Sequence, residues 1–560
     1  MNDAIPPRPN PTDPDGGGPL PSATRSSNLR LQAVLGHEFF APHQWKRRIA
    51  LWAGALLVAL AAIVFAKASD WSYHLFQRML THGIWIPLLI TPVVFALLAW
   101  VTEGKLRATR GSGIPQVIAT LHIEDEGFRQ RMLALPIAAG KMILTLLALA
   151  VGASIGREGP TVHVGAGIFY SLGRRFGFDD PKAASRFILA GGAAGIAAAF
   201  NTPLAGVVFA IEELAGTFEH RFSGLLLTAV IVGGVVSLGI MGNYAYFGRV
   251  ETVLPFGHAW LAVLWCGVIC GLLGGLFARL ILLSRSGPLA YIGRLRTRGP
   301  VLFAGGCGLV LAVLGVLTHN AVYGTGYDQA RAFVQEAVVT PGQSFGIAKL
   351  LANVVSYWAG IPGGIFSPAL AVGAGLGHNI ATFLPHVPEA SVVLLGMSAY
   401  LSGVTGAPLT SAVIAMELTD NQDMVIPIMA ACLLARAAAS LFCPTPVYKD
   451  FAERMVQDFE KQQAAQASAA EKARFEAEAM QYAGATTAFG EPAGPVVDKR
   501  VTDEDCADEV DGTGSDERDE PGADNYNADR RDVDRPDDDK HDTDASPGKE
   551  TSPGSPAREP

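Results

Sequence analysis

Charged residues are scarce in this sequence of 560 residues. Lys, Arg, Asp and Glu make up 17% of the chain, and the mean hydropathy is +0.28, whereas soluble domains usually contain about 25% charged residues. Residues 501–560 alone hold 21 Asp and Glu against 7 Lys and Arg, so the first 500 residues carry a net charge of +5. The acidic pI therefore describes a tail and gives no information about a partner of the body.

Cysteine is also rare, with six residues in the chain. Five of the six lie in or beside apolar segments, which argues against a disulfide framework. Cys266 and Cys270 are four residues apart, but no His or acidic residue accompanies them. We therefore expect no metal site and no other cofactor, and we expect no nucleic-acid partner.

Long apolar segments fill the middle of the chain. None begins before residue 49, which is too late for a secretory signal, and Lys46, Arg47 and Arg48 stand directly before the first one. That basic cluster predicts a cytoplasmic N-terminus. Several segments have the roughly 20 residues needed to cross about 30 Å of hydrocarbon. The apolar segments are 49–66, 84–101, 133–154, 186–214, 224–241, 257–284, 300–318, 345–358, 363–385, 391–418 and 424–443.

This pattern predicts an all-α polytopic protein of the inner (plasma) membrane with both termini in the cytoplasm. Gly and Pro interrupt some segments, at 152–167, 191–203 and 360–377. Such interruptions indicate half-helices that meet near the bilayer midplane, as in transporters. The 62 glycines also suit close helix packing in lipid.

Composition divides the chain into four parts. Residues 1–45 are predicted to be a disordered cytoplasmic leader, and residues 46–455 a transmembrane domain. Residues 456–483 have the Ala, Glu, Lys and Gln content of a cytoplasmic helix. Residues 484–560 are polar, acidic and short of aromatics, which predicts a disordered tail. No folded domain is expected after the membrane part.

Two pairs of segments show an internal repeat. Residues 156–166 and 364–374 share the frame G-x-x-x-P-x-x-x-V-G-A at an offset of 208. Residues 202–212 resemble residues 407–417 at an offset of 205. Two matches in the same order at nearly the same offset indicate a duplicated chain, with halves at about 46–242 and 257–448. In such transporters the binding site lies where the halves meet, whether the repeats are parallel or inverted.

A carboxylate lies within the broken part of the first half, in Gly156-Arg157-Glu158-Gly159-Pro160. A charge at membrane depth costs about 2.5–3.5 kcal/mol even on lenient scales, and it usually marks an ion or substrate path. A broken backbone at that depth survives only where it is buried in protein or lines a cavity. The second half has Phe366 where the first has Glu158, so the duplicated scaffold does not itself require an acid there.

Glycine-rich turns offer anion sites. Gly111-Ser112-Gly113 would expose backbone N–H groups and a hydroxyl, and a helix starting there would add about half a positive charge. Gly363 and Gly364 offer backbone N–H groups in the second half. Tyr448, just past the last apolar segment, is either an anion donor or an aromatic-belt residue. The residues whose backbone is expected to form the anion site are Gly111, Gly113, Gly156, Arg157, Gly159 and Gly364.

Two adjacent carboxylates, Glu212 and Glu213, end an apolar run. Neighbouring helix positions differ by about 100° in direction, so the two groups face different surroundings. Glu417 matches Glu212 in the repeat, which suggests that these two carboxylates have a structural role. Leu418 matches Glu213, so Glu213 belongs to one half only and is the better functional candidate.

Taken together, these residues resemble the CLC family of chloride channels and chloride/proton antiporters. The resemblance covers about residues 45–455. It rests on the motifs GSGIP at 111–115, GREGPTVHVGA at 156–166, AAAFNTPLAGVVFAIEEL at 197–214, GGIFSPALAVG at 363–373 and GAPLTSAVIAMELTDN at 406–421.

The resemblance implies a homodimer in the lipid bilayer, with two inverted halves and one anion path in each subunit. It makes Glu158 the gating glutamate, which occupies the anion site until it is protonated, and Glu213 the internal proton glutamate. The implied chloride ligands are Ser112, Ile365, Phe366 and Tyr448. Many passive channels lack the glutamate at position 213, so the resemblance favours exchange of chloride for protons.

Two other functions remain open on the sequence. A passive chloride channel on the same scaffold would leave Glu213 as a wetted carboxylate with no role in proton transport. An intramembrane enzyme is suggested by Gly152-Ala-Ser154-Ile-Gly156, which matches G-x-S-x-G. That motif needs a strand–turn–helix elbow and triad partners, which an apolar membrane segment does not offer.

Overall fold

A computed structural model describes residues 42–486, except 105, 216–223, 243–244, 283–287, 338 and 341. The chain divides into two compact units, residues 1–476 and 477–560. Within the second unit the described residues are the last turns of helix α21. Nearly all of the expected leader and acidic tail lies outside the described residues.

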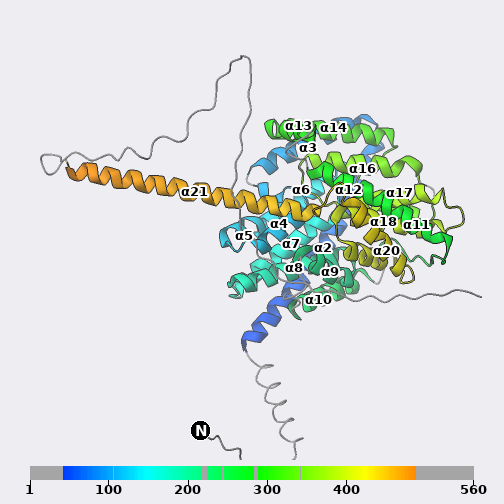
Figure 1. The fold of residues 1–560 in the computed structure, drawn as a ribbon, viewed down its shortest axis with the longest axis horizontal. Helices are drawn as coiled ribbons and strands as arrows, with labels where there is room; N and C mark the ends of the chain where they lie inside the picture. Colours follow the sequence, from blue (N-terminus) through cyan, green and yellow to red (C-terminus); the bar gives the residue numbers. More distant parts are fainter. Residues whose placement is uncertain are drawn as a thin grey trace, which may run out of the picture. The chain divides into compact units, whose positions relative to one another are not determined.

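The described residues fold almost entirely into helices (Figure 1). The first half contains α2 (Pro42–Leu80), α3 (Trp85–Glu103), η1 (Arg107–Thr109), α4 (Ile114–His122), α5 (Glu126–Leu133), α6 (Leu135–Leu149), α7 (Glu158–Arg175), α8 (Pro181–Phe200), α9 (Pro203–Phe209), the π-helix η2 (Ala210–Ala215) and α10 (Gly224–Met241). The second half and the following helix contain η3 (His258–Trp260), α11 (Leu261–Trp265), the π-helix η4 (Cys266–Cys270), α12 (Gly271–Leu282), α13 (Pro288–Arg298), α14 (Pro300–Leu317), α15 (Tyr327–Val334), α16 (Gly342–Trp358), α17 (Phe366–Ala381), α18 (Glu389–Thr405), α19 (Pro408–Thr419), α20 (Val425–Ala439) and α21 (Val447–Thr486).

Seven helical segments among the described residues are long and apolar enough to cross a membrane. They differ in exposure, since most of α8 is buried inside the protein whereas about a third of the α3 and α14 spans is buried. The apolar residues exposed on α3 include Leu89 and Trp100, as expected for a surface that meets lipid. The prediction of an all-α polytopic membrane protein is confirmed.

Two helix pairs, α7 with α8 and α17 with α18, make the most extensive contacts among the described helices and correspond to each other in the repeat. Gly165 of α7 meets Gly191 of α8, and a methyl group on either glycine would overlap the carbonyl oxygen of the other. In the second half, a methyl group on Gly373 or Gly396 would lie 2.5 Å from the carbonyl oxygen of its partner. Small residues thus let the backbones touch in both halves.

The break expected within residues 191–203 lies at the end of that range. Helix α8 runs without interruption through Gly191 to Phe200. The break falls at Asn201, which is left-handed with φ 58°, and at Thr202. Gly191 is therefore needed for the helix crossing and not for a turn. The boundary expected at 455/456 also falls inside a continuous helix, α21.

Gly191→Ala is expected to destabilise the protein by more than the about 1–3 kcal/mol typical of overpacking, because the added methyl meets rigid backbone. Gly239→Ala is the matched control, since Gly239 lies in α10 with no atom within 4 Å of the added carbon. Thermal unfolding of both purified variants checks this. Equal melting temperatures for the two variants would contradict the assignment of a tight crossing.

Candidate functional site

Short backbone pairings join the loops that precede α4, α7 and α17. The N–H of Gly156 donates to the carbonyl of Gly364, and the N–H of Gly364 donates to that of Gly156, both at 2.7 Å. The N–H of Gly363 donates to the carbonyl of Gly111 at 3.2 Å. Single-residue bridges therefore link Gly156 with Gly364 and Gly111 with Pro362. The two halves of the repeat meet at these loops.

The pairings bring three helix N-termini together. The N-cap residues are Gly113 for α4, Arg157 for α7 and Ile365 for α17, and none of them caps its helix with its own side chain. Gly113 has φ 109° and Gly111 has φ 69°, conformations that favour glycine. Helix N-termini leave N–H groups unpaired and carry partial positive charge, so this junction suits an anion.

Glu158 already provides an anion at this junction. The side chain is fully buried at 0% exposure. The hydroxyl of Ser367 donates to Oε1 at 2.5 Å, and the backbone N–H of Ser367 donates to Oε2 at 3.4 Å. Ser367 lies in the first turn of α17, so a carboxylate from the first half occupies the N-terminus of a helix in the second half.

Arg157 points in a different direction. Its Nη1 donates to Oδ1 of Asp70 at 2.7 Å and to the carbonyl of Ala66 at 2.9 Å, both on α2. The guanidinium thus holds α2 against the start of α7. The backbone of Arg157 lies at the anion junction, and its guanidinium remains within electrostatic range of Glu158.

Two buried hydroxyls lie close together at the junction. Ser112 is 1% exposed and Tyr448 is 0% exposed, and neither hydroxyl has a well-formed hydrogen bond to a described residue. Tyr448 lies beside Ser112 and within electrostatic range of Glu158 and Glu213. A buried hydroxyl without a partner costs about 1–3 kcal/mol, so these two donors favour a ligand that accepts from both.

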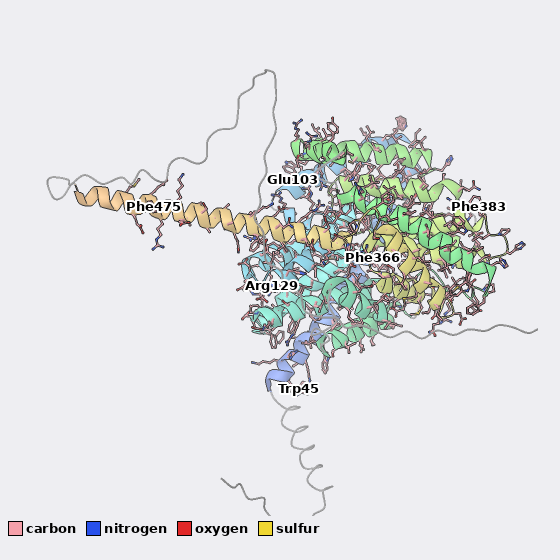
Figure 2. All side chains as sticks on the ribbon, viewed as in Figure 1. Trp45, Glu103, Arg129, Phe366, Phe383 and Phe475 are labelled. Atoms are coloured by element: carbon pink, nitrogen blue, oxygen red, sulfur yellow. The ribbon has the colours of Figure 1, made fainter. Side chains whose placement is uncertain are left out.

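Aromatic rings enclose the same place. Phe366, labelled in Figure 2, stacks on Tyr448 with ring centroids 5.9 Å apart and meets the edge of Phe209 at 6.0 Å. Ile365 is 5% exposed. The backbone N–H groups of Ile365 and Phe366 donate to no described residue. The four residues implied as chloride ligands therefore gather around one buried point.

Glu212 and Glu417 make a reciprocal contact between the halves. Glu212 accepts from the N–H groups of Leu409 and Thr410 at 3.1 and 2.6 Å, at the start of α19. Glu417 accepts from the corresponding N–H groups of Leu204 and Ala205 at 3.1 and 2.6 Å, at the start of α9. Each carboxylate caps a helix of the other half. Exchanged contacts of this kind are those of two halves related by a two-fold axis.

Glu213 has no such partner. It lies in the π-helix η2, directly after α9, and is partly exposed. No hydrogen bond or ion pair joins its carboxylate to a described residue, although Arg436 and Glu212 are near enough to interact electrostatically. Single π-helical turns often occur at functional sites. Glu213 is therefore a free carboxylate beside a structural one.

The structure contains two buried lysines that were not predicted from the sequence. Lys141 and Lys349 are both 0% exposed and differ by 208 residues, the offset of the repeat. Lys141 donates to the carbonyl of Gly111 at 3.2 Å. Lys349 donates to the carbonyls of Val322 and Gly324, both at 2.8 Å. Each lies within an apolar segment, and this charge at a matching offset could have revealed the pair.

Ser154 does not have the surroundings of a nucleophile. Its hydroxyl donates to Oδ1 of Asn353 at 2.7 Å and approaches the carbonyl of Val322 at 3.1 Å. Neither partner can act as a general base, and the segment follows helix α6 rather than a strand. Ser154 instead fastens the loop before α7 to α16.

Comparison with known proteins gives one family. A model described as the voltage gated chloride channel family matches residues 94–440. The H(+)/Cl(-) exchange transporter ClcA of Cronobacter sakazakii is 30% identical over 437 residues, covering 74% of this chain and 90% of that protein. The H(+)/Cl(-) exchange transporter ClcA of Citrobacter koseri is 29% identical, covering 73% and 88%.

Solved structures show the same fold. A slow cyanobacterial Cl-/H+ antiporter matches with a TM-score of 0.61 and 24% identity, covering 74% of this chain and 98% of that one. A CLC-type fluoride/proton antiporter matches with a TM-score of 0.59 and 24% identity, covering 71% and 98%. Over most of its length, including all three loops of the junction, the chain belongs to the voltage gated chloride channel family.

Proposed function

We propose that this protein exchanges chloride for protons across the membrane, the activity for which its relatives from Cronobacter and Citrobacter are named. The observation that carries the proposal is the position of Glu158. Its carboxylate accepts from Ser367 at the N-terminus of α17, which is the place where a helix binds an anion. A chloride ion and the charged carboxylate therefore compete for the positive end of the same helix, α17.

Competition for one place links chloride binding to protonation. A charged Glu158 repels and replaces chloride, whereas a protonated Glu158 no longer needs the N–H and hydroxyl donors and can leave them. Chloride then takes its ligands from the Ser112 and Tyr448 hydroxyls and the N–H groups of Ile365 and Phe366. The unpaired state of the two buried hydroxyls supports this assignment.

Glu213 is the second proton station in this proposal. It is partly exposed and unpaired, and it lies within electrostatic range of Tyr448, as Glu158 does. A proton taken up by Glu213 would reach Glu158 past the chloride site. The passive-channel alternative keeps the same chloride ligands and gives Glu213 no part in proton movement.

The remaining assignments belong to the same proposal. We place the protein in the inner membrane as a homodimer, with one anion path in each subunit and both termini in the cytoplasm. Ser112, Tyr448 and the start of α21 then lie on the cytoplasmic side of Glu158.

Proton pumping in liposomes tests the proposal. Purified protein in vesicles with a chloride gradient and no initial pH gradient is expected to move protons uphill, which a pH-sensitive dye outside the vesicles would detect. Rapid chloride flux without any proton movement would favour the passive channel instead.

A further inference from the structure

A tyrosine follows the last helix of each half of the repeat, and both tyrosines lie within electrostatic range of Glu158. Tyr448 comes after α20 and lies beside Ser112. Tyr246 comes after α10 and lies beside Ser367, the residue that donates to Glu158. The proposed function gives Tyr448 a role as a chloride ligand and leaves Tyr246 without one.

A row of aromatic rings connects the two tyrosines. Phe366, labelled in Figure 2, stacks on Tyr448, and the centroid of its ring lies 6.5 Å from that of Phe200. The rings of Phe200 and Tyr246 meet edge to face with centroids 5.8 Å apart. Tyr448 and Tyr246 therefore form the two ends of a row that runs past the anion junction.

The surrounding residues fix the position of the Tyr246 ring. The side chain is 4% exposed, and its ring meets Phe247 and Tyr327 with centroids 5.0 and 4.7 Å apart. The hydroxyl of Tyr327 donates to the carbonyl of Tyr246 at 2.8 Å. The N–H of Phe247 donates to the carbonyl of Leu418 in α19 at 3.0 Å. A ring held on several sides presents its hydroxyl in one direction, as a positioned donor requires.

The hydroxyl of Ser367 determines the direction of the hydrogen bonds. A serine hydroxyl has one proton to donate and two lone pairs that accept. Ser367 gives its proton to Oε1 of Glu158, so toward Tyr246 it can only accept. Tyr246 is therefore the donor, and the chain of donors runs from Tyr246 through Ser367 to the carboxylate. Each donor in such a chain polarises and strengthens the next.

With the proposed cytoplasmic N-terminus, Tyr246 lies on the outer side of Glu158. Asp70 follows Arg48 by 22 residues along the continuous helix α2, a rise of roughly 33 Å and close to the thickness of the hydrocarbon. The carboxylate of Asp70 is 58% exposed and pairs with Arg157. Both of these charged groups are within electrostatic range of the Tyr246 hydroxyl. The chain of donors thus reaches Glu158 from the outer mouth.

We propose that Tyr246 is a positioning residue for Glu158, whose hydroxyl acts through Ser367 to hold the charged carboxylate at the N-terminus of α17 and so sets how readily chloride displaces it. The part of this statement that concerns chloride rests on the proposed function. A carboxylate accepts hydrogen bonds more strongly than a protonated carboxyl group. The Tyr246 hydroxyl therefore favours the charged form of Glu158, which excludes chloride, over the protonated form, which admits it.

Tyr246→Phe removes the hydroxyl and keeps the ring. Chloride flux in vesicles rises as the pH falls, because protonated Glu158 leaves its place. In the variant the half-maximal flux should occur about 0.4 to 1 pH unit higher than in the wild type, the effect of one neutral hydrogen bond. At constant pH, the chloride concentration for half-maximal flux should fall by a factor of about 2 to 6. The other charged or titratable groups that face Glu158 or Tyr246 stay in place; they are Arg157, Tyr448 and Asp70.

Tyr323→Phe is the matched control. Tyr323 is also buried, and its hydroxyl donates to the carbonyl of Ala312, so this variant should keep the wild-type pH midpoint. Ser367→Ala should raise the midpoint as Tyr246→Phe does, and the double variant should go little further, because both substitutions interrupt the same chain of donors toward Glu158. Equal midpoints in the wild type and Tyr246→Phe would overturn the proposal, as would fully additive shifts in the double variant.

A tyrosine analogue tests the same hydroxyl without removing any group. A tyrosine with fluorine on both ring positions beside the hydroxyl is more acidic and is a stronger donor. At position 246 this analogue should move the midpoint to lower pH, opposite to Tyr246→Phe, and a shift to higher pH or no shift would overturn the role of Tyr246. Wild-type chloride flux without proton transport would remove the proposed exchange, whereas opposite midpoint shifts in the two forms would still support the positioning of Glu158 by Tyr246.

Discussion

Glu158→Gln is expected to abolish proton transport while chloride still crosses the membrane. An amide cannot take up or release a proton at neutral pH, and it carries no charge to compete with chloride at the N-terminus of α17, where Glu158 accepts from Ser367. Proton flux should fall by at least about 100-fold, the lower end of what a positioned proton-transfer group contributes. Chloride flux should change far less, because the chloride ligands remain in place. Parallel chloride and proton recordings from vesicles measure both.

Glu126→Gln is a suitable control for this substitution. Glu126 also begins a helix, α5, but its side chain is exposed and pairs with Arg174 on the surface. We expect this variant to keep the full chloride-to-proton ratio. If Glu158→Gln also kept that ratio, Glu158 would have no part in proton transfer, and its burial at the junction would need another explanation.

Glu213→Gln is the second substitution expected to remove proton transport. The carboxylate has no hydrogen bond or ion pair to lose among the described residues, so the fold should be unaffected. Proton flux should again fall by at least about 100-fold, while chloride flux persists. Recording the two fluxes together with the thermal stability of the variant distinguishes a lost proton station from a damaged protein.

Replacement of the neighbouring Glu212 is expected to lower stability and to leave proton transport intact. Glu212→Gln weakens the cap on α19, and we expect the free energy of unfolding to fall by about 1–2 kcal/mol. Glu417→Gln weakens the corresponding cap on α9 and should lower the stability by a similar amount. The folded fraction of either variant should still couple chloride to protons. Unaltered proton flux in Glu213→Gln would leave Glu213 as a wetted carboxylate with no role in proton transport.

The repeat made much of the site predictable. Matching residues 156–166 with 364–374 pointed to two loops that would be equivalent, and the structure pairs those loops through Gly156 and Gly364. The match of Glu212 with Glu417 suggested a structural pair, and the reciprocal caps bear that out. Sequence offsets predict such contacts because a duplicated chain places equivalent segments against each other around its symmetry axis.

Contacts between unrelated segments were not predictable in this way. The donor to Glu158 is Ser367, a residue inside a recognised motif, but only the geometry shows that it reaches the carboxylate. The position of the break within residues 191–203 was not predictable either, because a glycine that permits close helix packing looks the same in sequence as one that breaks a helix.

The reversal potential of the reconstituted protein under opposed chloride and pH gradients decides whether chloride movement is tied to proton movement. Exchange through Glu158 and Glu213 predicts a reversal potential that departs from the chloride equilibrium potential and moves with the pH gradient at constant chloride. A reversal potential that stays at the chloride equilibrium value at every pH would contradict exchange and leave a passive chloride path.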